Sequence, residues 1–138
     1  MMIEIHDDIN VDEYNKLRVE AGWEIKSPLI VEKAIRNRTI IKKATYDSKT
    51  VGMARAIGDG MSYLLVDVVV SSKYQKQGIG KKLVNSIIDA IKNETMAGEY
   101  STINLISIRG MEKFYESCGF EAVPFGYNGK GMRIKIEK

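Results

Sequence analysis

Residues 66–91 read VDVVVSSKYQKQGIGKKLVNSIIDAI, an apolar run that gives way to a glycine-containing turn and then to a helical pattern. The run Leu64–Val70 is β-branched and apolar at both alternating sets of positions, which is typical of a central strand covered on both faces. From Ile79 onward, apolar residues recur at the spacing of one face of a helix. This stretch therefore predicts a strand, a turn and an amphipathic helix.

The turn places Gly78 and Gly80 where the helix should begin. Glycine allows consecutive backbone N–H groups to point toward a ligand, and a helix N-terminus favours negative charge. Neither the P-loop motif nor the dinucleotide fingerprint can be read here. We expect the turn to bind a phosphate-bearing ligand, and the alternative is a glycine-rich turn that binds nothing.

The segment from Gln75 to Gly80, QKQGIG, resembles the Q/R-x-x-G-x-G/A signature of the GNAT superfamily of N-acetyltransferases. Residues 114–120, FYESCGF, are similar to the family's F-Y-x-x-x-G-F block near the C-terminus. The resemblance implies acetyl-CoA as the cosubstrate, no metal, a pyrophosphate held by the turn amides, and a pantetheine paired with the preceding strand. The cofactor-binding residues that it implies are Val68, Val69, Val70, Gln75, Lys76, Gln77, Gly78, Ile79, Gly80, Lys81 and Phe114.

The other segments predict elements in the order of the GNAT fold. We expect strands at 3–5, 39–46, 50–57, 62–70, 102–106, 120–123 and 132–136, and helices at 10–21, 27–36, 79–93 and 109–118. The fold class is α/β (mixed α+β), with a mostly antiparallel, twisted sheet of six to seven strands and helices on both faces. The strands at 62–70 and 102–106 should be parallel and splay apart after a bulge.

Two residues are candidates for catalysis. Tyr115 matches the tyrosine that many GNAT enzymes use as general acid, and a phenol with an ordinary pKa of about 10 stays protonated at neutral pH. The alternative for Tyr115 is a core aromatic. Asp67 is the one charge in an apolar strand, and there desolvation would raise the pKa of a carboxyl toward that of a general base. Equally, Asp67 could pair with a lysine or a backbone group and fix the bulge.

The loop between the first two helices carries Trp23 and Glu24, which correspond to one wall of the family's acceptor site. We expect both to contact substrate, although Trp23 could be a packing residue and Glu24 a solvated one. Cys118 lies on the last turn of a helix, where the dipole disfavours a thiolate, so direct transfer is expected rather than an acetyl-cysteine. Ile108 stands where many members carry an asparagine that contacts pantetheine, which leaves the contacts on that side undefined.

A chain of 138 residues with 44% hydrophobic and 28% charged residues predicts one globular domain, 1–138. A net charge of +3 and a single cysteine give no indication of a nucleic-acid partner, a membrane or an oxidising compartment, so a cytoplasmic location is expected. The predicted function is acetyl transfer to a primary amine of a small molecule. A protein lysine or N-terminal acetyltransferase and a non-catalytic CoA-binding module are the alternatives, and a homodimer remains open.

Overall fold

A five-stranded sheet in the order β1-β2-β3-β4-β5 forms the centre of the first of two compact units, Met1–Leu105 and Ile106–Lys138. The computed structural model describes residues 2–138. The pairs β1–β2, β2–β3 and β3–β4 are antiparallel, and β5 is parallel to β4. The strands are β1 (Ile3–His6), β2 (Thr39–Tyr46), β3 (Lys49–Gly58), β4 (Ser62–Val70) and β5 (Thr102–Asn104).

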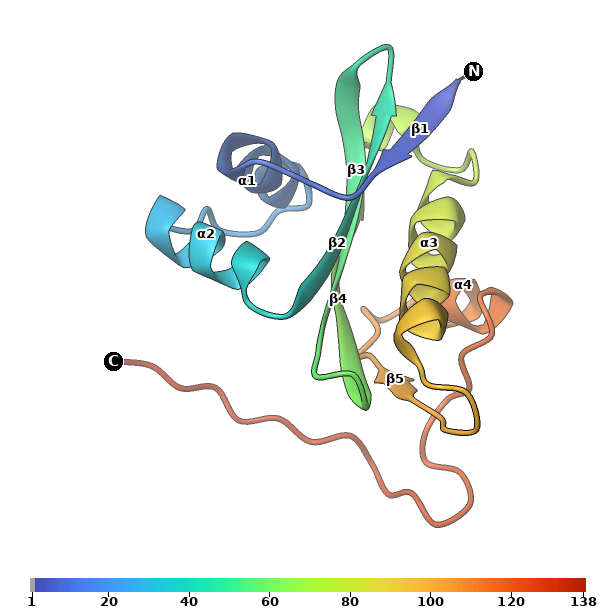
Figure 1. Ribbon diagram of the computed structural model, residues 1–138. Helices are drawn as coiled ribbons and strands as arrows, with labels where there is room; N and C mark the ends of the chain where they lie inside the picture. Colours follow the sequence, from blue (N-terminus) through green and yellow to red (C-terminus); the bar gives the residue numbers. More distant parts are fainter. Residues whose placement is uncertain (1) are drawn as a thin grey trace. The chain divides into compact units, whose positions relative to one another are not determined.

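Three helices cover this sheet, with α1 (Val11–Glu20) and α2 (Pro28–Arg36) on one face and α3 (Ile79–Glu94) on the other (Figure 1). The cap of α1 is the predicted capping box, in which the Asn10 side chain and the Glu13 side chain each bond the other's backbone N–H. Ser27 caps α2 with Pro28 at its first position. None of the described helices has the length and hydrophobicity that crossing a bilayer requires.

Apolar side chains are buried on both faces of the sheet. Beneath α1 and α2, Leu17 and Val31 pack with Met53 and Val69, whereas α3 buries its own stripe against the opposite face. β3 and β4 approach closely at Gly52, where a Cβ would lie 3.0 Å from the Val69 carbonyl oxygen. In β4, Tyr63, Leu65 and Val69 are buried and Val66 and Val68 are partly buried, whereas Leu64 is 41% exposed, so the strand is covered on both faces only in part.

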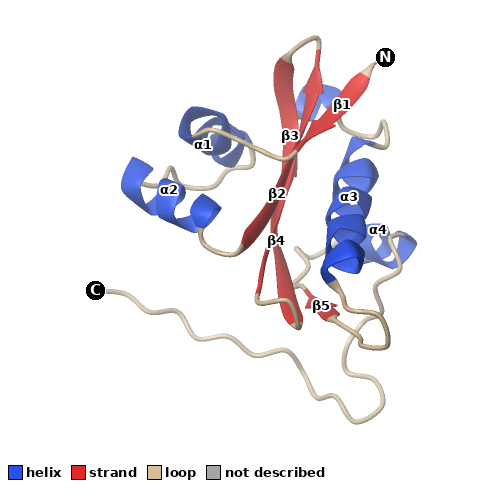
Figure 2. Ribbon diagram, in the orientation of Figure 1, coloured by secondary structure: helices blue, strands red, loops and turns tan. Residues whose placement is uncertain are grey.

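The unit 106–138 contains one short helix, α4 (Glu112–Ser117), and the chain after it is drawn as loop (Figure 2). The strands predicted at 120–123 and 132–136 are not formed, so the described residues contain five strands rather than six to seven. Met132, Ile134 and Ile136 are 93%, 82% and 74% exposed. Their alternation with charged residues is compatible with a strand, but a strand also requires a neighbour for its backbone hydrogen bonds.

Candidate functional site

The turn before α3 has the backbone geometry of an anion site. Gly78 is the N-cap of α3 with φ 83°, and Lys76 in the same turn has φ 61°. No side chain caps α3, so the first N–H groups of the helix remain available to a ligand. An added Cβ at Gly78 would meet no atom within 4 Å, so glycine is required there for its φ rather than for space. These features fit a pyrophosphate group.

Some side chains of this turn point toward the protein and others point toward solvent. Gln75 points back, and its Nε2 donates to the Val70 carbonyl at 2.9 Å, which ties the turn to the end of β4. Ile79 is buried, so it can offer a ligand only its backbone. Lys76, Gln77 and Lys81 are exposed. Of the predicted cofactor residues in this turn, Gln75 and Ile79 therefore hold the turn in place, whereas Lys76, Gln77 and Lys81 have side chains that a ligand can reach.

β4 contains the expected bulge. Met53 pairs with Val69 and Arg55 pairs with Val66, so two residues of β4 oppose Ala54 alone. Asp67, inside the bulge, has φ 49°. The pairing of β4 with β5 ends at Leu64. Within the described part of the first unit, the β5-side edge of Val68–Val70 is thus unpaired, as backbone recognition of a ligand requires.

Asp67 is surrounded by donors from two other elements. Its carboxylate accepts a hydrogen bond from the Tyr14 hydroxyl and another from Arg55 Nε at 2.8 Å, and Arg18 Nη1 lies 3.7 Å away. The Asp67 side chain is only 11% exposed. This geometry favours the alternative in which Asp67 is an ion-pair partner at the bulge, with arginines in place of the expected lysine.

Arg18 links this carboxylate to the predicted acceptor loop. Its guanidinium lies 5.4 Å from the centre of the Trp23 ring, and its Nε donates to the Glu24 carbonyl at 2.7 Å. Trp23 is half-buried against the core beneath α1 and α2. Glu24 uses its backbone here, and its side chain is exposed. Trp23 therefore both packs and presents its ring to a cation.

Sequence reasoning missed Tyr14, Arg18 and Arg55. Burial raises the pKa of Tyr14, and the hydrogen bond and charge of Asp67 raise it further, so the phenol is neutral at physiological pH. Arg55 was detectable as the single charge among buried residues of β3, just as Asp67 is in β4. Two lone charges in neighbouring strands are a signal for a buried pair.

In the second unit, Tyr115 lies on α4 and is half-buried. Its ring packs edge-on against Phe114 and Phe120, with centroid distances of 5.0 and 6.0 Å. Burial raises the pKa of the Tyr115 phenol, with a smaller contribution from Cys118. The phenol therefore remains protonated over a wide pH range. Ile108, at the position of the family's asparagine, is exposed.

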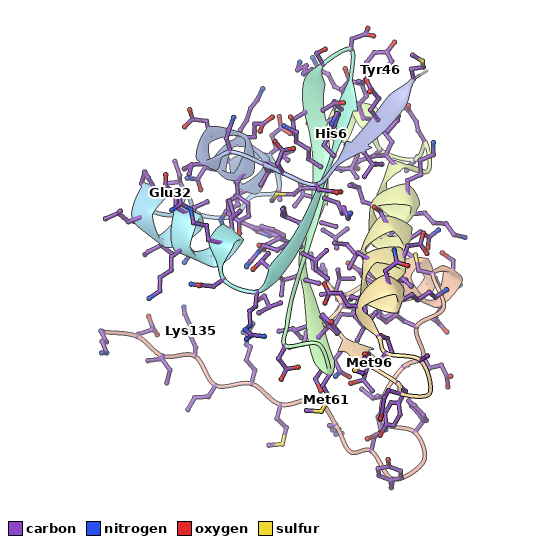
Figure 3. The ribbon with its side chains drawn as sticks, viewed as in Figure 1. His6, Glu32, Tyr46, Met61, Met96 and Lys135 are labelled. Carbon is purple, nitrogen blue, oxygen red and sulfur yellow. The ribbon has the colours of Figure 1, made fainter. Side chains whose placement is uncertain are left out.

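The turn lies at one end of the sheet. Tyr46 marks this end in Figure 3, and its ring lies 5.7 Å from that of Tyr74 in the turn. Met61, in the β3–β4 connection, marks the opposite end. A pocket of about 310 Å³ lies at this opposite end, where Tyr63 donates to Glu94 at 2.6 Å. This pocket is separate from the turn.

Comparisons with known proteins agree with this geometry. The model of the GNAT acetyltransferase domain matches residues 11–134. An uncharacterized N-acetyltransferase, ycf52, of Pyropia yezoensis is 34% identical over 128 residues, which cover 88% of this chain and 71% of the relative.

Solved structures share the fold. A protein of methicillin-resistant Staphylococcus aureus described as a probable acetyltransferase has a TM-score of 0.80 at 30% identity, with 98% of this chain and 100% of that chain covered. Glucosamine-6-phosphate N-acetyltransferase of Arabidopsis thaliana has a TM-score of 0.71 at 15% identity, with 94% and 99% covered. With the family match spanning nearly all of its elements, the chain belongs to the GNAT acetyltransferase family and is an N-acetyltransferase.

Proposed function

We propose that this protein transfers the acetyl group of acetyl-CoA to the primary amine of a small molecule, by direct attack within a ternary complex. The observation that carries the proposal is the turn before α3, with left-handed Gly78 and an uncapped helix start next to the unpaired edge of Val68–Val70. The turn suits the pyrophosphate and the strand edge suits the pantetheine amides.

The proposed mechanism gives Tyr115 the role of general acid. A neutral amine nitrogen attacks the thioester carbonyl carbon, the bond from that carbon to sulfur breaks, and the Tyr115 hydroxyl donates its proton to the departing sulfur. The raised pKa of Tyr115 supports this role, because the proton is still present at neutral and mildly alkaline pH. Phe114 packs against the Tyr115 ring and would hold it in place.

Removal of the amine proton is assigned to water. Asp67 was the sequence-based candidate for a base, but its carboxylate is held by Tyr14, Arg55 and Arg18. We therefore propose that Asp67 anchors the bulge. Asp67→Asn should leave the acidic limb of the pH–rate profile in place, whereas a loss or shift of that limb would restore Asp67 as the base.

The small-molecule acceptor draws support from relatives that share the fold. The solved neighbours include a glucosamine-6-phosphate N-acetyltransferase and an aminoglycoside acetyltransferase. A protein acceptor is the second candidate, because one relative, from Glycine max, is a histone acetyltransferase and is 27% identical over 134 residues. We favour the small molecule because both of these solved neighbours are named for small-molecule acceptors. The proposal includes a cytoplasmic location, although two relatives from Arabidopsis thaliana are named as chloroplastic.

Thiol release from acetyl-CoA, measured with a panel of small amines and with lysine-containing peptides, tests the function. Tyr115→Phe should lower kcat by roughly 100-fold or more, the effect of losing a positioned general acid. Tyr127→Phe is the matched control, because Tyr127 is 100% exposed and should have no effect. Equal rates for wild type and Tyr115→Phe at every pH would remove the general-acid assignment. Binding of acetyl-CoA without turnover of any amine would favour the non-catalytic module.

A second experiment tests the phosphate site. Gly78→Val should raise KM for acetyl-CoA by about 10-fold or more, because the turn amides would lose their left-handed geometry and their charge-assisted contacts. Gly98→Val is the control, since Gly98 also has a positive φ (84°) and open space around its Cα, but lies outside the turn. An equal rise in KM for both variants would show a general effect of strain and contradict the site.

A further inference from the structure

The cluster of Tyr14, Arg18, Arg55 and Asp67 carries more positive than negative charge. Arg18 and Arg55 are 14% and 12% exposed, and among the described residues the only carboxylate that forms an ion pair with either of them is that of Asp67. Tyr14 is neutral. Among the described residues, the cluster thus has one uncompensated positive charge in a partly buried setting, where unpaired charge is costly.

Part of the hydrogen-bonding capacity of both guanidinium groups is unused. Arg55 and Arg18 each donate through Nε, to Asp67 and to the Glu24 carbonyl respectively. Their terminal nitrogens make only weaker contacts with the described residues: Arg18 Nη1 lies 3.7 Å from the Asp67 carboxylate, and Arg18 also interacts with the Tyr14 hydroxyl, which acts to lower the pKa of Tyr14. No buried side-chain nitrogen or oxygen in this part of the chain lacks a partner. The terminal nitrogens therefore reach solvent and can receive a ligand.

The position of the cluster relates it to the reaction. Asp67 directly precedes Val68–Val70, the segment proposed to pair with the pantetheine, and Arg55 pairs with Val66 across the bulge. The rings of Trp23 and Tyr14 lie 5.4 and 5.9 Å from the Arg18 guanidinium. The surplus cation is therefore next to the proposed acceptor site, between aromatic side chains that limit its contact with water.

We propose that Arg18 and Arg55 form a subsite for a carboxylate, so that the preferred acceptor is an amine that also carries a carboxylate group. This inference rests on the proposed function and names its acceptor class. A carboxylate is favoured over a phosphate because a single surplus charge is balanced by a monoanion, and a guanidinium fork matches a carboxylate in two parallel hydrogen bonds. Arg18 and Arg55 are specificity-determining residues here, and they do not contact the reacting atoms.

The test compares amines that differ only in the acid group. Glycine, β-alanine and 4-aminobutyrate are each paired with their amides, and 2-aminoethyl phosphate is added as the dianionic probe. Binding to the full chain is measured by calorimetry with and without CoA, and KM is measured with acetyl-CoA. At least one acid should bind about 10- to 100-fold more tightly than its amide, the range for a charge-assisted contact. The chain length of the acid that binds most tightly indicates the distance between the bound amine and the two arginines.

Variants then assign this preference to the cluster. Arg18→Gln and Arg55→Gln should each reduce the acid-to-amide ratio to about 3-fold or less. Arg55→Lys, which retains the charge, should preserve part of the ratio. Arg36→Gln removes an equal charge from an exposed position on α2 and should leave the ratio intact. Thermal melting identifies any variant that fails to fold. If Arg55→Gln fails to fold, Arg18→Gln and Arg55→Lys provide the test.

The outcomes separate this inference from the function on which it rests. Equal binding of every acid and its amide, or a ratio that both Gln variants leave unchanged, would overturn the subsite even if amines are acetylated. Tighter binding of the phosphate than of every carboxylate would overturn the assignment to a monoanion. Discrimination for acids with no acetylation of any amine would retain the subsite and overturn the proposed function.

Discussion

Helix α1 is joined to the sheet by charged side chains at both ends, and the two ends differ in their charge balance. Near its start, Glu13 accepts hydrogen bonds from Thr50 Oγ1, from the Asn10 backbone and from Lys43 Nζ at 3.2 Å. Near its end, Arg18 shares Asp67 with Arg55. The first cluster pairs its lysine with a carboxylate, whereas the second leaves one positive charge unpaired. We infer that the first attaches the helix and the second also binds a ligand.

The largest expected effect comes from removing the shared carboxylate. Asp67→Ala should lower the free energy of unfolding by roughly 3–5 kcal/mol, because two partly buried arginines and a buried phenol lose their common acceptor. Denaturant unfolding measures the change. Asp89→Ala, on the exposed side of α3, is the control and should stay within about 0.5 kcal/mol of wild type. A loss of less than about 1 kcal/mol for Asp67→Ala would show that solvent already satisfies the arginines.

A smaller effect is expected at the other end of the helix. Glu13→Gln should cost about 1 kcal/mol at neutral pH, because glutamine can retain the capping box but not the ion pair with Lys43. Burial acts to raise the pKa of Glu13, yet the hydrogen bonds from Thr50, Asn10 and Lys43 together lower it below its ordinary value of 4.5.

That lowered pKa sets the pH dependence of the Glu13 contribution. The stabilisation is fully present above the unfolded-state pKa and is lost as pH falls through the lower folded-state pKa. The difference in stability between wild type and Glu13→Gln should therefore shrink as pH is lowered below about 4.5. Unfolding curves across this range provide the measurement, and a constant difference at all pH values would contradict the assignment to the Glu13 charge.

The smallest effect on the free energy of unfolding is expected for an ion pair whose carboxylate is exposed. Lys42 Nζ lies 2.6 Å from Asp7, which is 82% exposed. Asp7→Ala should change the free energy of unfolding by less than about 0.5 kcal/mol, because water and salt screen such a pair. A cost comparable to that of Asp67→Ala would mean that burial does not determine the strength of these charge contacts.

Local signals in the sequence predicted most of the first unit. The capping box of Asn10 and Glu13 and the stripe from Ile79 placed α1 and α3 almost to the residue. The turn at Asp47 and Ser48 placed the β2–β3 hairpin, and both residues adopt the left-handed conformation that a tight hairpin uses. These features depend on neighbouring residues, so one sequence is enough to identify them.

Features that depend on distant partners were less predictable. The alternation of Met132, Ile134 and Ile136 indicated a strand, but the alternation does not specify the edge with which a strand pairs. Likewise, Asp67 was singled out as a lone charge, while its partners Arg18 and Arg55 come from α1 and β3. The turn from Gln75 to Gly80 and the helix start after it were predictable because their backbone geometry depends on a few consecutive residues.

The bulge in β4 has a consequence for which side chains the strand delivers to each layer. Before it, Tyr63 points toward α3, where it bonds Glu94, and after it, Val69 packs with Leu17 on the opposite face. These residues are an even number of positions apart, so a regular strand would direct both to one face. The extra residue therefore reverses the face of the sheet toward which each later side chain of β4 points. Deleting Val68 would cancel it and turn the Asp67 carboxylate toward the apolar stripe of α3, away from both arginines.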